Sequence, residues 1–355
     1  MFTRLILAIL PALALAITAC SRHPLSPENK GTILSSPIPR SALSSLSPIE
    51  DRIAVPPDER NPPQRGLVDN YPAWSPDGRW VVFRRLRASS YGPQGLYIIP
   101  SAGGTPRLVL AGFPPVQPRF SPDGQRLVGT HGGQLVIIDL RSGAMTMPMY
   151  TDNGVDSPDW SPDGRSIVYG RTHRDQFPPE PFDSAGLHVL DVETGLDRPL
   201  YYNGEVLPSS IARWIRNGRA VALLHGFANG GVGLSIASLD GREFTTVYSV
   251  SSPMLLWNLQ RISPARPASG PRAQESLVMI LIGPTAYEGT LEVTLDPFDV
   301  SDRQQLRLWD ALSPTGREAV VVRPDPKDSL AVLYVRRDDA SPQARMRQLT
   351  RFDPP

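Results

Sequence analysis

The sequence predicts an all-β fold, a six-bladed β-propeller of four-stranded antiparallel blades, and three observations lead to this prediction. A five-residue phrase, an aromatic residue followed by Ser-Pro-Asp-Gly, occurs three times. A run of β-branched and aromatic residues follows each copy. The copies lie 46 and then 40 residues apart, from Asp77 to Asp123 to Asp163. That interval is the length of one four-stranded supersecondary unit, so the phrase marks a repeating blade.

The phrase has the chemistry of a tight turn between two antiparallel strands. In its first copy, Pro76 fixes φ near −65°, Asp77 can accept a hydrogen bond from a nearby backbone amide, and Gly78 tolerates a left-handed conformation. We therefore predict structural turn roles, rather than a ring of catalytic carboxylates, for the Asp–Gly pairs. These are Asp77 with Gly78, Asp123 with Gly124, and Asp163 with Gly164.

The segments after each phrase predict the remaining strands of the first three blades. Short apolar runs of strand character follow at 80–83, 126–128 and 166–169. A second set of runs, expected as third strands, occupies 96–99, 135–139 and 187–191. Glycine-containing turns at 103–104, 142–143 and 194–195 then lead to a weaker fourth strand in each blade.

Beyond residue 200 the phrase decays but does not disappear. The fourth copy keeps the aromatic Trp214 together with Asn217 and Gly218, and the sixth keeps Ser-Pro-Thr before Gly316. We predict turns at both places, followed by strands at 220–224 and 319–322. The fifth copy retains only a fragment at 262–264, before a Pro/Arg-rich insertion to about residue 274 and a strand at 277–282.

The repeat, a proline lead-in and an aromatic-Ser-Pro-Asp-Gly phrase before an apolar strand, resembles that of TolB-like propellers, a WD-like family of bacterial periplasmic proteins. The resemblance covers residues 69–355, which we take as the propeller domain. It implies a protein-binding or scaffolding propeller at the cell envelope. The chain departs from the Tol-system protein because a tether, and not an α/β domain, precedes the propeller, so direct membership of the Tol assembly is not expected.

The N-terminal segment has the features of an export signal. Arg4 precedes an apolar stretch of about 15 residues interrupted by Pro11, which is shorter than the roughly 20 residues of a membrane-spanning helix. The following Ile-Thr-Ala-Cys resembles the lipobox of bacterial lipoproteins, so we predict a signal peptide at 1–19 and lipidation of Cys20. Two or more acyl chains would anchor the protein to a membrane. The alternative is ordinary signal cleavage with Cys20 incidental.

Residues 20–68 are rich in serine and proline and predict an extended tether. A short apolar piece at 53–55 leaves open an added edge strand. Lysine plus arginine number 36 against 35 aspartates plus glutamates, so the net charge of +1 gives little of the phosphate attraction that nucleic-acid binders show. We therefore predict no nucleic-acid partner, and we expect a monomeric domain.

No catalytic motif is recognisable in the sequence. No Gly-x-Ser-x-Gly elbow and no His-Glu-x-x-His zinc motif occurs. His131, His173 and His225 each follow the second strand of a blade, and we interpret them as solvated loop residues. A convergent metal or acid/base cluster is the alternative. We thus predict no catalytic residue, no metal and no cofactor.

We place the functional face where the loops between second and third strands and the inter-blade connections emerge around the central channel, because binding residues concentrate on such loops. The leading hypothesis is a membrane-anchored, non-enzymatic scaffold that binds a protein, peptide or cell-wall component. The alternatives are a propeller hydrolase or lyase and a carbohydrate-binding module. A histidine cluster would favour the enzyme, and a channel mouth without convergent titratable groups would favour the binder. The candidate partner-binding residues are Asp69, Asn70, Tyr71, Asp152, Asn153, Asp156, Phe177, Glu180, Phe182 and Glu205.

Overall fold

The computed structural model describes thirteen stretches of the chain. They are residues 67–87, 94–151, 154–172, 185–209, 211–226, 232–250, 255–262, 276–282, 287–295, 298–303, 310–324, 331–337 and 346–350. The predicted signal peptide, Cys20 and the tether up to residue 66 lie outside them, as does the Pro/Arg-rich insertion of the fifth blade.

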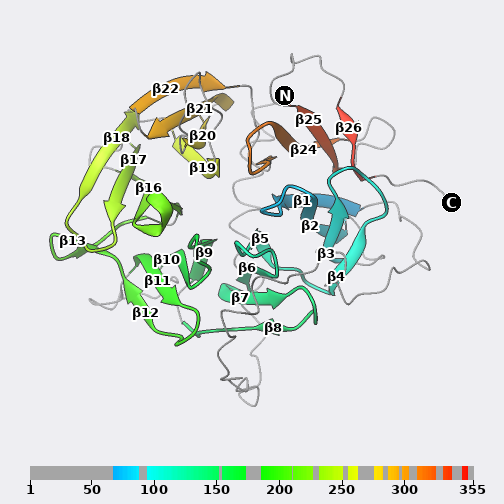
Figure 1. The fold of residues 1–355 in the computed structure, drawn as a ribbon, viewed down its shortest axis with the longest axis horizontal. Helices are drawn as coiled ribbons and strands as arrows, with labels where there is room; N and C mark the ends of the chain where they lie inside the picture. The colour runs from blue at the N-terminus through cyan, green and yellow to red at the C-terminus, as the bar shows by residue number, and fades with distance from the viewer. Residues whose placement is uncertain are drawn as a thin grey trace, which may run out of the picture.

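The described residues form six four-stranded antiparallel sheets arranged as a six-bladed propeller, which confirms the predicted fold (Figure 1). Blade one contains β1 (Leu67–Trp74), β2 (Trp80–Arg87), β3 (Gly95–Pro100) and β4 (Arg107–Ala111). Blade two contains β5 (Val116–Phe120), β6 (Arg126–His131), β7 (Gln134–Asp139) and β8 (Met145–Thr146). Blade three contains β9 (Gly154–Trp160), β10 (Ser166–Thr172), β11 (Gly186–Asp191) and β12 (Asp197–Pro199).

The second half of the ring follows the same order. Blade four contains β15 (Ile211–Ile215), β16 (Ala220–Gly226), β17 (Val232–Ser238) and β18 (Phe244–Val250). Blade five contains β19 (Leu255–Ile262), β20 (Ser276–Ile282), β21 (Tyr287–Leu295) and β22 (Phe298–Arg303). Blade six contains β23 (Ala311–Leu312), β24 (Glu318–Pro324), β25 (Ala331–Arg337) and β26 (Arg347–Gln348). A hairpin of β13 (Tyr201–Tyr202) and β14 (Glu205–Val206) joins blades three and four.

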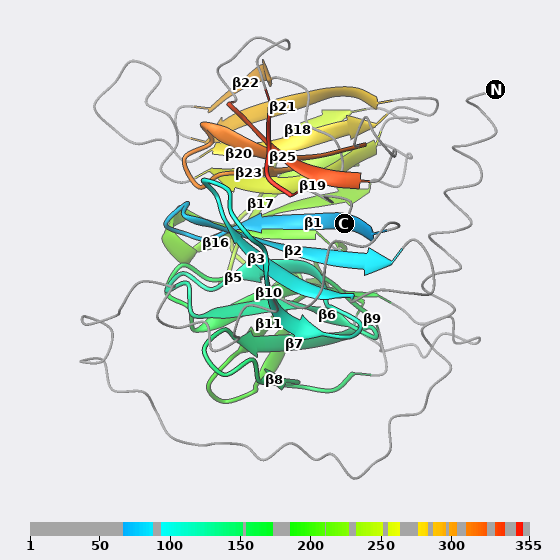
Figure 2. The same ribbon diagram turned by 90° about the vertical axis from the view of Figure 1, so that its right-hand side faces the viewer.

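The first strand of each blade is the innermost, and these six strands surround the propeller axis. Contacts run around the ring from β1 to β5, β9, β15, β19 and β23 and back to β1. Figure 2 shows that the strands run roughly along this axis. Each blade's two faces are therefore buried against its neighbours, which explains why the strands read as nearly continuous apolar runs.

The Ser-Pro-Asp-Gly phrase forms the turn between the first two strands of its blade. In blade one, Ser75 Oγ accepts a hydrogen bond from Trp80 N at 2.9 Å and donates one to Asp77 Oδ1. Asp77 Oδ1 also accepts from Arg79 N at 3.1 Å, and Gly78 has φ 71°. Serine, aspartate and glycine thus each satisfy a separate requirement of the turn, so the phrase recurs intact. In blade four a single 3-10 turn, η4 (Arg216–Gly218), replaces it, with Asn217 at φ 53°.

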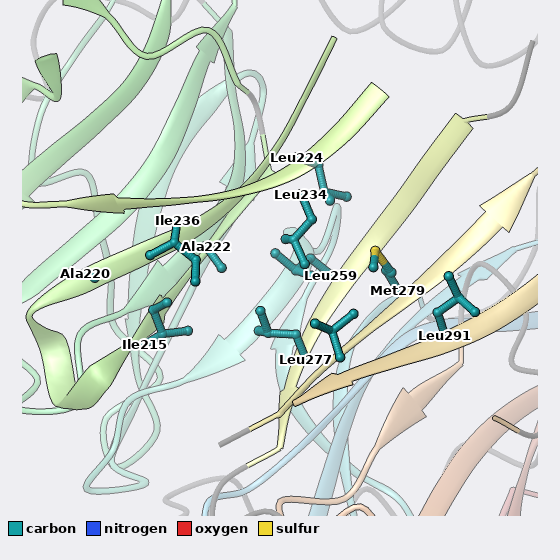
Figure 3. Packing of buried hydrophobic residues seen from close by; sticks show 11 residues of the cluster. Ile215, Ala220, Ala222, Leu224, Leu234, Ile236, Leu259, Leu277, Met279 and Leu291 are labelled. Atoms are coloured by element: carbon teal, nitrogen blue, oxygen red, sulfur yellow. The ribbon is translucent and has the colours of Figure 1, made fainter. Parts of the chain in front are cut away.

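The core consists of side chains packed between adjacent blades. Between blades four and five, Leu234 and Ile236 of β17 pack with Leu259 of β19 and with Leu277 and Met279 of β20 (Figure 3). These five side chains are at most 5% exposed. Burial of such a side chain contributes about 1.5–3 kcal/mol, so the inter-blade seams supply much of the stability.

The ring closes without a shared strand. Blade one takes all its strands from the start of the described chain, and blade six takes all of its strands from the end. Across this seam, Trp74 Nε1 donates to Ala311 O at 3.0 Å and Arg347 Nη2 donates to Ser101 O at 2.6 Å. Trp74 also packs in one apolar cluster with residues of β24 and β25, including Val320. Side-chain packing and hydrogen bonds therefore hold blades one and six together in place of a shared strand.

The Trp74 bond is one of a series. Trp160 Nε1 donates to Arg119 O at 3.3 Å, and Trp214 Nε1 donates to Asp159 O at 3.1 Å. In each case the tryptophan of one blade reaches the carbonyl that lies just before the corresponding residue of the preceding blade. The aromatic residue of the phrase thus ties neighbouring inner strands together, a role that the sequence alone did not suggest.

We predict that Trp74→Phe lowers the free energy of unfolding by about 1–3 kcal/mol, because the buried Ala311 carbonyl loses its partner and the smaller phenyl ring fills less of the space of the indole. Phe120 occupies the same place in blade two, so a phenyl ring fits there. Chemical denaturation measures the change. Trp160→Phe, which removes a longer bond at an interior seam, is the matched control and should cost less. A Trp74→Phe protein as stable as the wild type would contradict this account of closure.

Candidate functional site

Three inner strands carry the same distortion close to the axis. Tyr71, Gln117 and Ser157 each precede a proline and have left-handed φ values of 50°, 52° and 49°. The pairing of each inner strand with the second strand skips at this point. Such bulges bend a strand and re-aim its side chains, and they occur often beside functional sites. A left-handed non-glycine residue costs on the order of 1–3 kcal/mol, so the surrounding structure must hold it in place.

The bulges correct one sequence-based interpretation. Asn70, Tyr71 and Asp156 were expected in the connections between blades, but they lie within the inner strands β1 and β9. β1 begins at Leu67, two residues before the predicted start of the domain at Asp69. The proline does not end the strand because the bulge accommodates its missing N–H, and pairing resumes after it.

Polar side chains from blades one to four gather around these bulges, and we call them the axial cluster. Most of them are partly accessible to solvent, whereas Arg213 is only 5% exposed. The members are Asn70, Tyr71, Arg84, Gln117, Arg119, His131, Asp156, Asp159 and Arg213.

Asp69 lies on the face of blade one that points away from the axial cluster. It is fully buried, and its two carboxylate oxygens accept hydrogen bonds from Arg85 Nε at 2.7 Å and Nη2 at 2.8 Å. Arg85 also lies over the rings of Phe83 and Tyr97, at 5.3 and 4.8 Å from their centroids. Asp69 is therefore committed to an internal ion pair and is not exposed to a partner.

Arg84, which directly precedes the buried Arg85, lies on the other face of blade one. Trp80 and Val82 of the same strand pack against blade two, and the alternation of side chains along a strand places Arg84 on that side. Its guanidinium carbon lies 5.9 Å from the centroid of the Tyr71 ring. Its partner in the strand register is Asn70, whose buried Oδ1 has no hydrogen-bond partner among the described residues.

The electrostatics show that these groups from different blades are close together. Burial raises the pKa of Tyr71, the Arg84 charge opposes this, and the Asp156 charge of blade three adds to it. Burial and the Arg84 charge lower the pKa of His131 of blade two. His131 is therefore neutral at pH 7. Titratable groups do converge at the axis, so the condition that would have favoured a simple binder is not met.

Gln117 fixes the bulge of the next blade. Its Oε1 accepts a hydrogen bond from Ser157 N at 2.8 Å. Burial raises the pKa of Asp156, while hydrogen bonds from Gln117 and Ser157 and the Arg213 charge oppose the rise. The carboxylate is thus held in place by neutral donors as well as by an arginine.

Three charged side chains occupy the position just before the aromatic residue in consecutive blades. They are Arg119, Asp159 and Arg213. Asp159 Oδ2 accepts from Trp214 N at 3.1 Å, and Arg213 Nη1 donates to Ser157 O at 3.2 Å and Ala212 O at 2.6 Å. Sequence reasoning missed all three because it sought binding residues in loops. The available signal was a charge inside an otherwise apolar strand.

The remaining candidates are placed as follows. Glu205 is exposed on the β13–β14 hairpin, which lies at the outer edge of the ring, away from the axis (Figure 1). His225 Nε2 lies 2.7 Å from Ser235 Oγ, and its ring packs edge-on against Phe244 of the outermost strand, β18. Outside the described residues lie Asp152, Asn153, His173, Phe177, Glu180 and Phe182.

The described stretches contain no group of three or more His, Cys, Asp or Glu side chains placed to hold a metal ion. Nor do they contain a helix with the length and apolar character needed to cross a bilayer.

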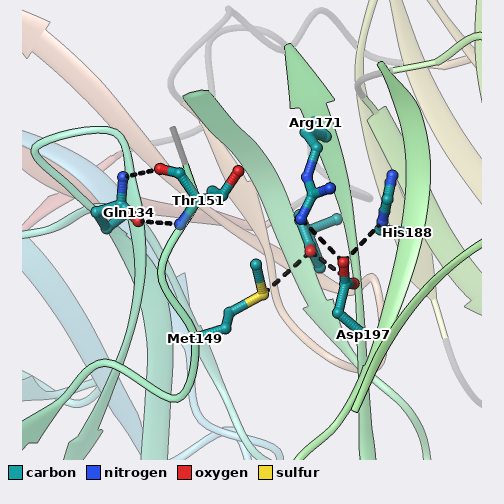
Figure 4. A network of polar contacts seen from close by, with 7 residues as sticks. Gln134, Met149, Thr151, Arg171, His188 and Asp197 are labelled. Atoms are coloured by element: carbon teal, nitrogen blue, oxygen red, sulfur yellow. Dashed lines mark hydrogen bonds and ion pairs between the residues drawn. The ribbon is translucent and has the colours of Figure 1, made fainter. Parts of the chain in front are cut away.

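A second polar network lies between blades two and three, farther from the axis (Figure 4). Asp197 accepts hydrogen bonds from Tyr169 OH at 2.7 Å and Arg171 Nη2 at 2.9 Å, and His188 Nδ1 lies 3.0 Å from it. Burial would raise the pKa of Asp197, but the bonds from His188 and Tyr169 and the positive charges hold it below its ordinary value. Tyr169 OH also contacts Met149 Sδ of the segment after β8 at 3.1 Å. The network therefore fastens β12 to its own blade and to blade two.

We predict that Asp197→Asn weakens the acid dependence of stability. Because the folded pKa of Asp197 is depressed, its contribution is complete above the ordinary value of 3.8 and is lost as the pH falls below it. The variant should lose about 1–3 kcal/mol at pH 7 and show a smaller further loss at low pH. Urea unfolding between pH 7 and pH 3 measures this. Glu205→Gln, on the exposed β13–β14 hairpin, is the control. Parallel pH profiles for wild type and Asp197→Asn would refute the assignment.

Comparisons with known proteins agree with the fold and leave the function open. No family model matches the chain. A stretch of 117 residues is 31% identical to the uncharacterized protein Atu1656 of Agrobacterium fabrum, covering 31% of this chain and only 39% of that protein. The match therefore spans well under half of the curated relative.

Solved structures share the propeller fold at low sequence identity. An oligogalacturonate lyase in complex with manganese has a TM-score of 0.52 and 14% identity, covering 79% of this chain and 80% of that one. The oligogalacturonate lyase from Vibrio parahaemolyticus has 0.52 and 12%, covering 83% of each chain. TolB from Acinetobacter baumannii has 0.50 and 14%, covering 79% of this chain but 65% of that one. At these identities the likeness establishes the fold alone.

Proposed function

We propose that this protein is a non-enzymatic, membrane-anchored propeller that binds a protein or peptide partner at the cell envelope through the end of the propeller where the axial cluster lies. One observation carries the proposal. Asn70 and Asp156 come from the first halves of inner strands, with Tyr71 next to Asn70 at the middle of β1, and Arg84 and His131 come from the second halves of second strands. In antiparallel blades these halves lie at the same end of the ring. That end also carries the connections between second and third strands.

The geometry of the cluster suits binding. Its bulges are held by proline, by Gln117 and by packing between blades, so a ligand would meet groups that are already in position. Preorganisation of this kind reduces the conformational entropy lost on association. The inner strands also pair with another strand on one edge only among the described residues. Side chains bond some backbone groups of the other edge, such as Ser157 N and Arg119 O, and the remaining donors and acceptors face the axis. A peptide main chain complements such donors and acceptors.

The envelope location rests on the N-terminal sequence. An export signal and the lipobox-like Ile-Thr-Ala-Cys support a lipid anchor at Cys20, and the Ser/Pro-rich segment supports a tether. The resemblance of the repeat to TolB-like propellers supports the same compartment.

A second candidate function is a lyase acting on a uronate oligosaccharide, and the convergence of Arg84, His131 and Tyr71 favours it. An arginine would neutralise the uronate carboxylate, and a neutral histidine would remove the adjacent carbon-bound proton. The glycosidic C–O bond would then break, leaving a C=C bond in one product, and the departing oxygen would take up a proton. The two oligogalacturonate lyases that share the fold give this candidate its substrate class.

We predict that capture of an envelope partner depends on the axial end of the propeller. Tyr71→Ala and Gln117→Ala should reduce by at least about tenfold the partner that photo-crosslinks to the wild-type protein in cells, because each removes part of the preorganised surface. Tyr201→Ala, on the exposed hairpin at the rim, is the matched control and should capture normally. Mass spectrometry with quantitation measures the yield.

Two results would overturn the binding function. One is equal capture by the Tyr71 and Tyr201 variants. The other is absence of capture together with release of unsaturated, ultraviolet-absorbing products from trigalacturonate by the wild-type protein, but not by His131→Ala. The second result would establish the lyase instead.

We predict that Cys20→Ala moves the protein from the membrane fraction to the soluble fraction, because the thiol that would be acylated is lost. Fractionation followed by immunoblotting measures the distribution. Ser21→Ala keeps the thiol and serves as the control. Unchanged membrane retention of Cys20→Ala would refute the anchor.

A further inference from the structure

Among the side chains that the structure describes, charged residues of blades two, three and four lie at one level of the inner strands. At the position just before the aromatic residue of the phrase or its counterpart, blades one and six carry Ala73 and Ala311. Blades two, three and four carry Arg119, Asp159 and Arg213. Two guanidinium groups thus flank one carboxylate, so this level of the axis has an excess of positive charge although the whole chain has a net charge of only +1.

Arg119 differs from Arg85 and Arg323 in what it contacts. Arg85 and Arg323 each form two hydrogen bonds to a buried aspartate, Asp69 and Asp310 respectively. Arg119 Nη1 donates to the carbonyl of Pro118 at 3.3 Å. Among the described residues, no carboxylate lies within 4.0 Å of its guanidinium nitrogens.

We propose that Arg119 binds a carboxylate of the peptide ligand at the axis, with Arg213 adding to the positive potential. This rests on the proposed binding function and names the ligand as an acidic peptide. Arg119 is a partly exposed residue of the inner strand β5, so the proposal requires that the ligand carboxylate enter between the inner strands along the axis. A guanidinium fork matches the two oxygens of a carboxylate, and such bonds are among the strongest that a side chain makes.

The local electrostatics support an anionic ligand. Burial lowers the pKa of Arg119, the Arg213 charge lowers it further, and Asp159 opposes them only in part. Asp159 is itself engaged with Trp214 N. A bound carboxylate would relieve the repulsion between the two guanidinium groups and replace the water that a buried cation lacks.

Asn70 Oδ1, the buried acceptor on β1, can be satisfied by a donor from either kind of ligand, a peptide N–H or a sugar hydroxyl. The backbone of the inner strands favours a peptide over a uronate oligosaccharide. The inner strands β1, β5 and β9 present one unpaired edge among the described residues, and an extended peptide carries donors and acceptors at the matching spacing.

The experiment uses the full-length protein and three probes at constant ionic strength. They are the peptide acetyl-Gly-Glu-Gly-amide, its neutral isostere acetyl-Gly-Gln-Gly-amide, and trigalacturonate. Binding is measured by calorimetry at millimolar ligand. We expect the glutamate peptide to bind at least about tenfold more tightly than the glutamine peptide, a difference of about 1.4 kcal/mol.

Variants assign the effect to Arg119. Arg119→Gln should abolish the preference for glutamate, and Arg119→Lys should keep part of it because the charge remains without the fork. Arg242→Gln, at an exposed turn, is the matched control and should keep all of it. Denaturation of each variant verifies that it folds. If Arg119→Gln does not fold, the folded Arg119→Lys variant provides the test. Bidentate recognition is contradicted if this variant keeps the full preference for the glutamate peptide.

Three outcomes would overturn the inference. They are equal binding of the two peptides, no binding of either, and Arg119-dependent binding of trigalacturonate alone. The proposed function is tested separately by capture in cells. Capture that depends on Tyr71 but not on Arg119 would leave the binding function standing and count only against the role of Arg119. Absence of capture even by the wild-type protein would count against the binding function itself.

Discussion

The bond between Trp74 and the Ala311 carbonyl joins the two ends of the ring, and the axial cluster depends on that closure. Among the described residues, blades one and six each complete their sheets from consecutive strands, and no backbone ladder crosses between them. Within that part of the chain, closure relies on one apolar seam and a few hydrogen bonds made by side chains. Displacement of blade one would move Asn70, Tyr71 and Arg84 relative to His131 and Asp156. The site and the closing seam of the ring thus share a blade, which couples binding at the axis to stability of the closure.

The same inner strands store strain where the polar groups meet. Tyr71, Gln117 and Ser157 hold left-handed conformations that glycine would adopt freely, yet none is glycine. The turns at the other end of blades one to three place glycine at the left-handed position, such as Gly78 and Gly164, whereas the turn of blade four has Arg216 and Asn217 there. The side chains at the bulges contribute in part to folding, since Gln117 bonds the backbone of the next bulge. The strain also places polar side chains where the inner strands face the axis.

Much of the fold was predictable because the residues that form each turn are consecutive in the sequence. Serine, proline, aspartate and glycine act within a few residues of one another, so the number of blades and most strand positions followed from the sequence. Even the decayed fourth copy kept Asn217 and Gly218, which form the turn of η4. The site was predictable only in part, since its members are brought together by the ring and not by local sequence. Asn70, Tyr71 and Asp156 reach the axis, whereas Asp69 turns out to be bonded to Arg85, sixteen residues away. Arg119 and Arg213 were missed because binding residues were sought in loops, whereas these two side chains lie within the inner strands β5 and β15.

The charge at the axis bears on both candidate functions. A net charge of +1 suggests no strong preference for an anion, but it averages over the whole chain, whereas a ligand experiences the field of the groups around it. A buried arginine attracts a carboxylate whether the ligand is an acidic peptide or a uronate, so the anion is common to the two functions. The two functions differ in what they require of His131. In a binding protein, His131 would be one more neutral side chain that contacts the ligand beside Arg84. In a lyase it must accept a proton from carbon, and its lowered pKa makes it a weaker base than an ordinary histidine. The surroundings that favour the neutral form of His131 therefore also limit its basicity, so proton abstraction would require more of this side chain than binding does.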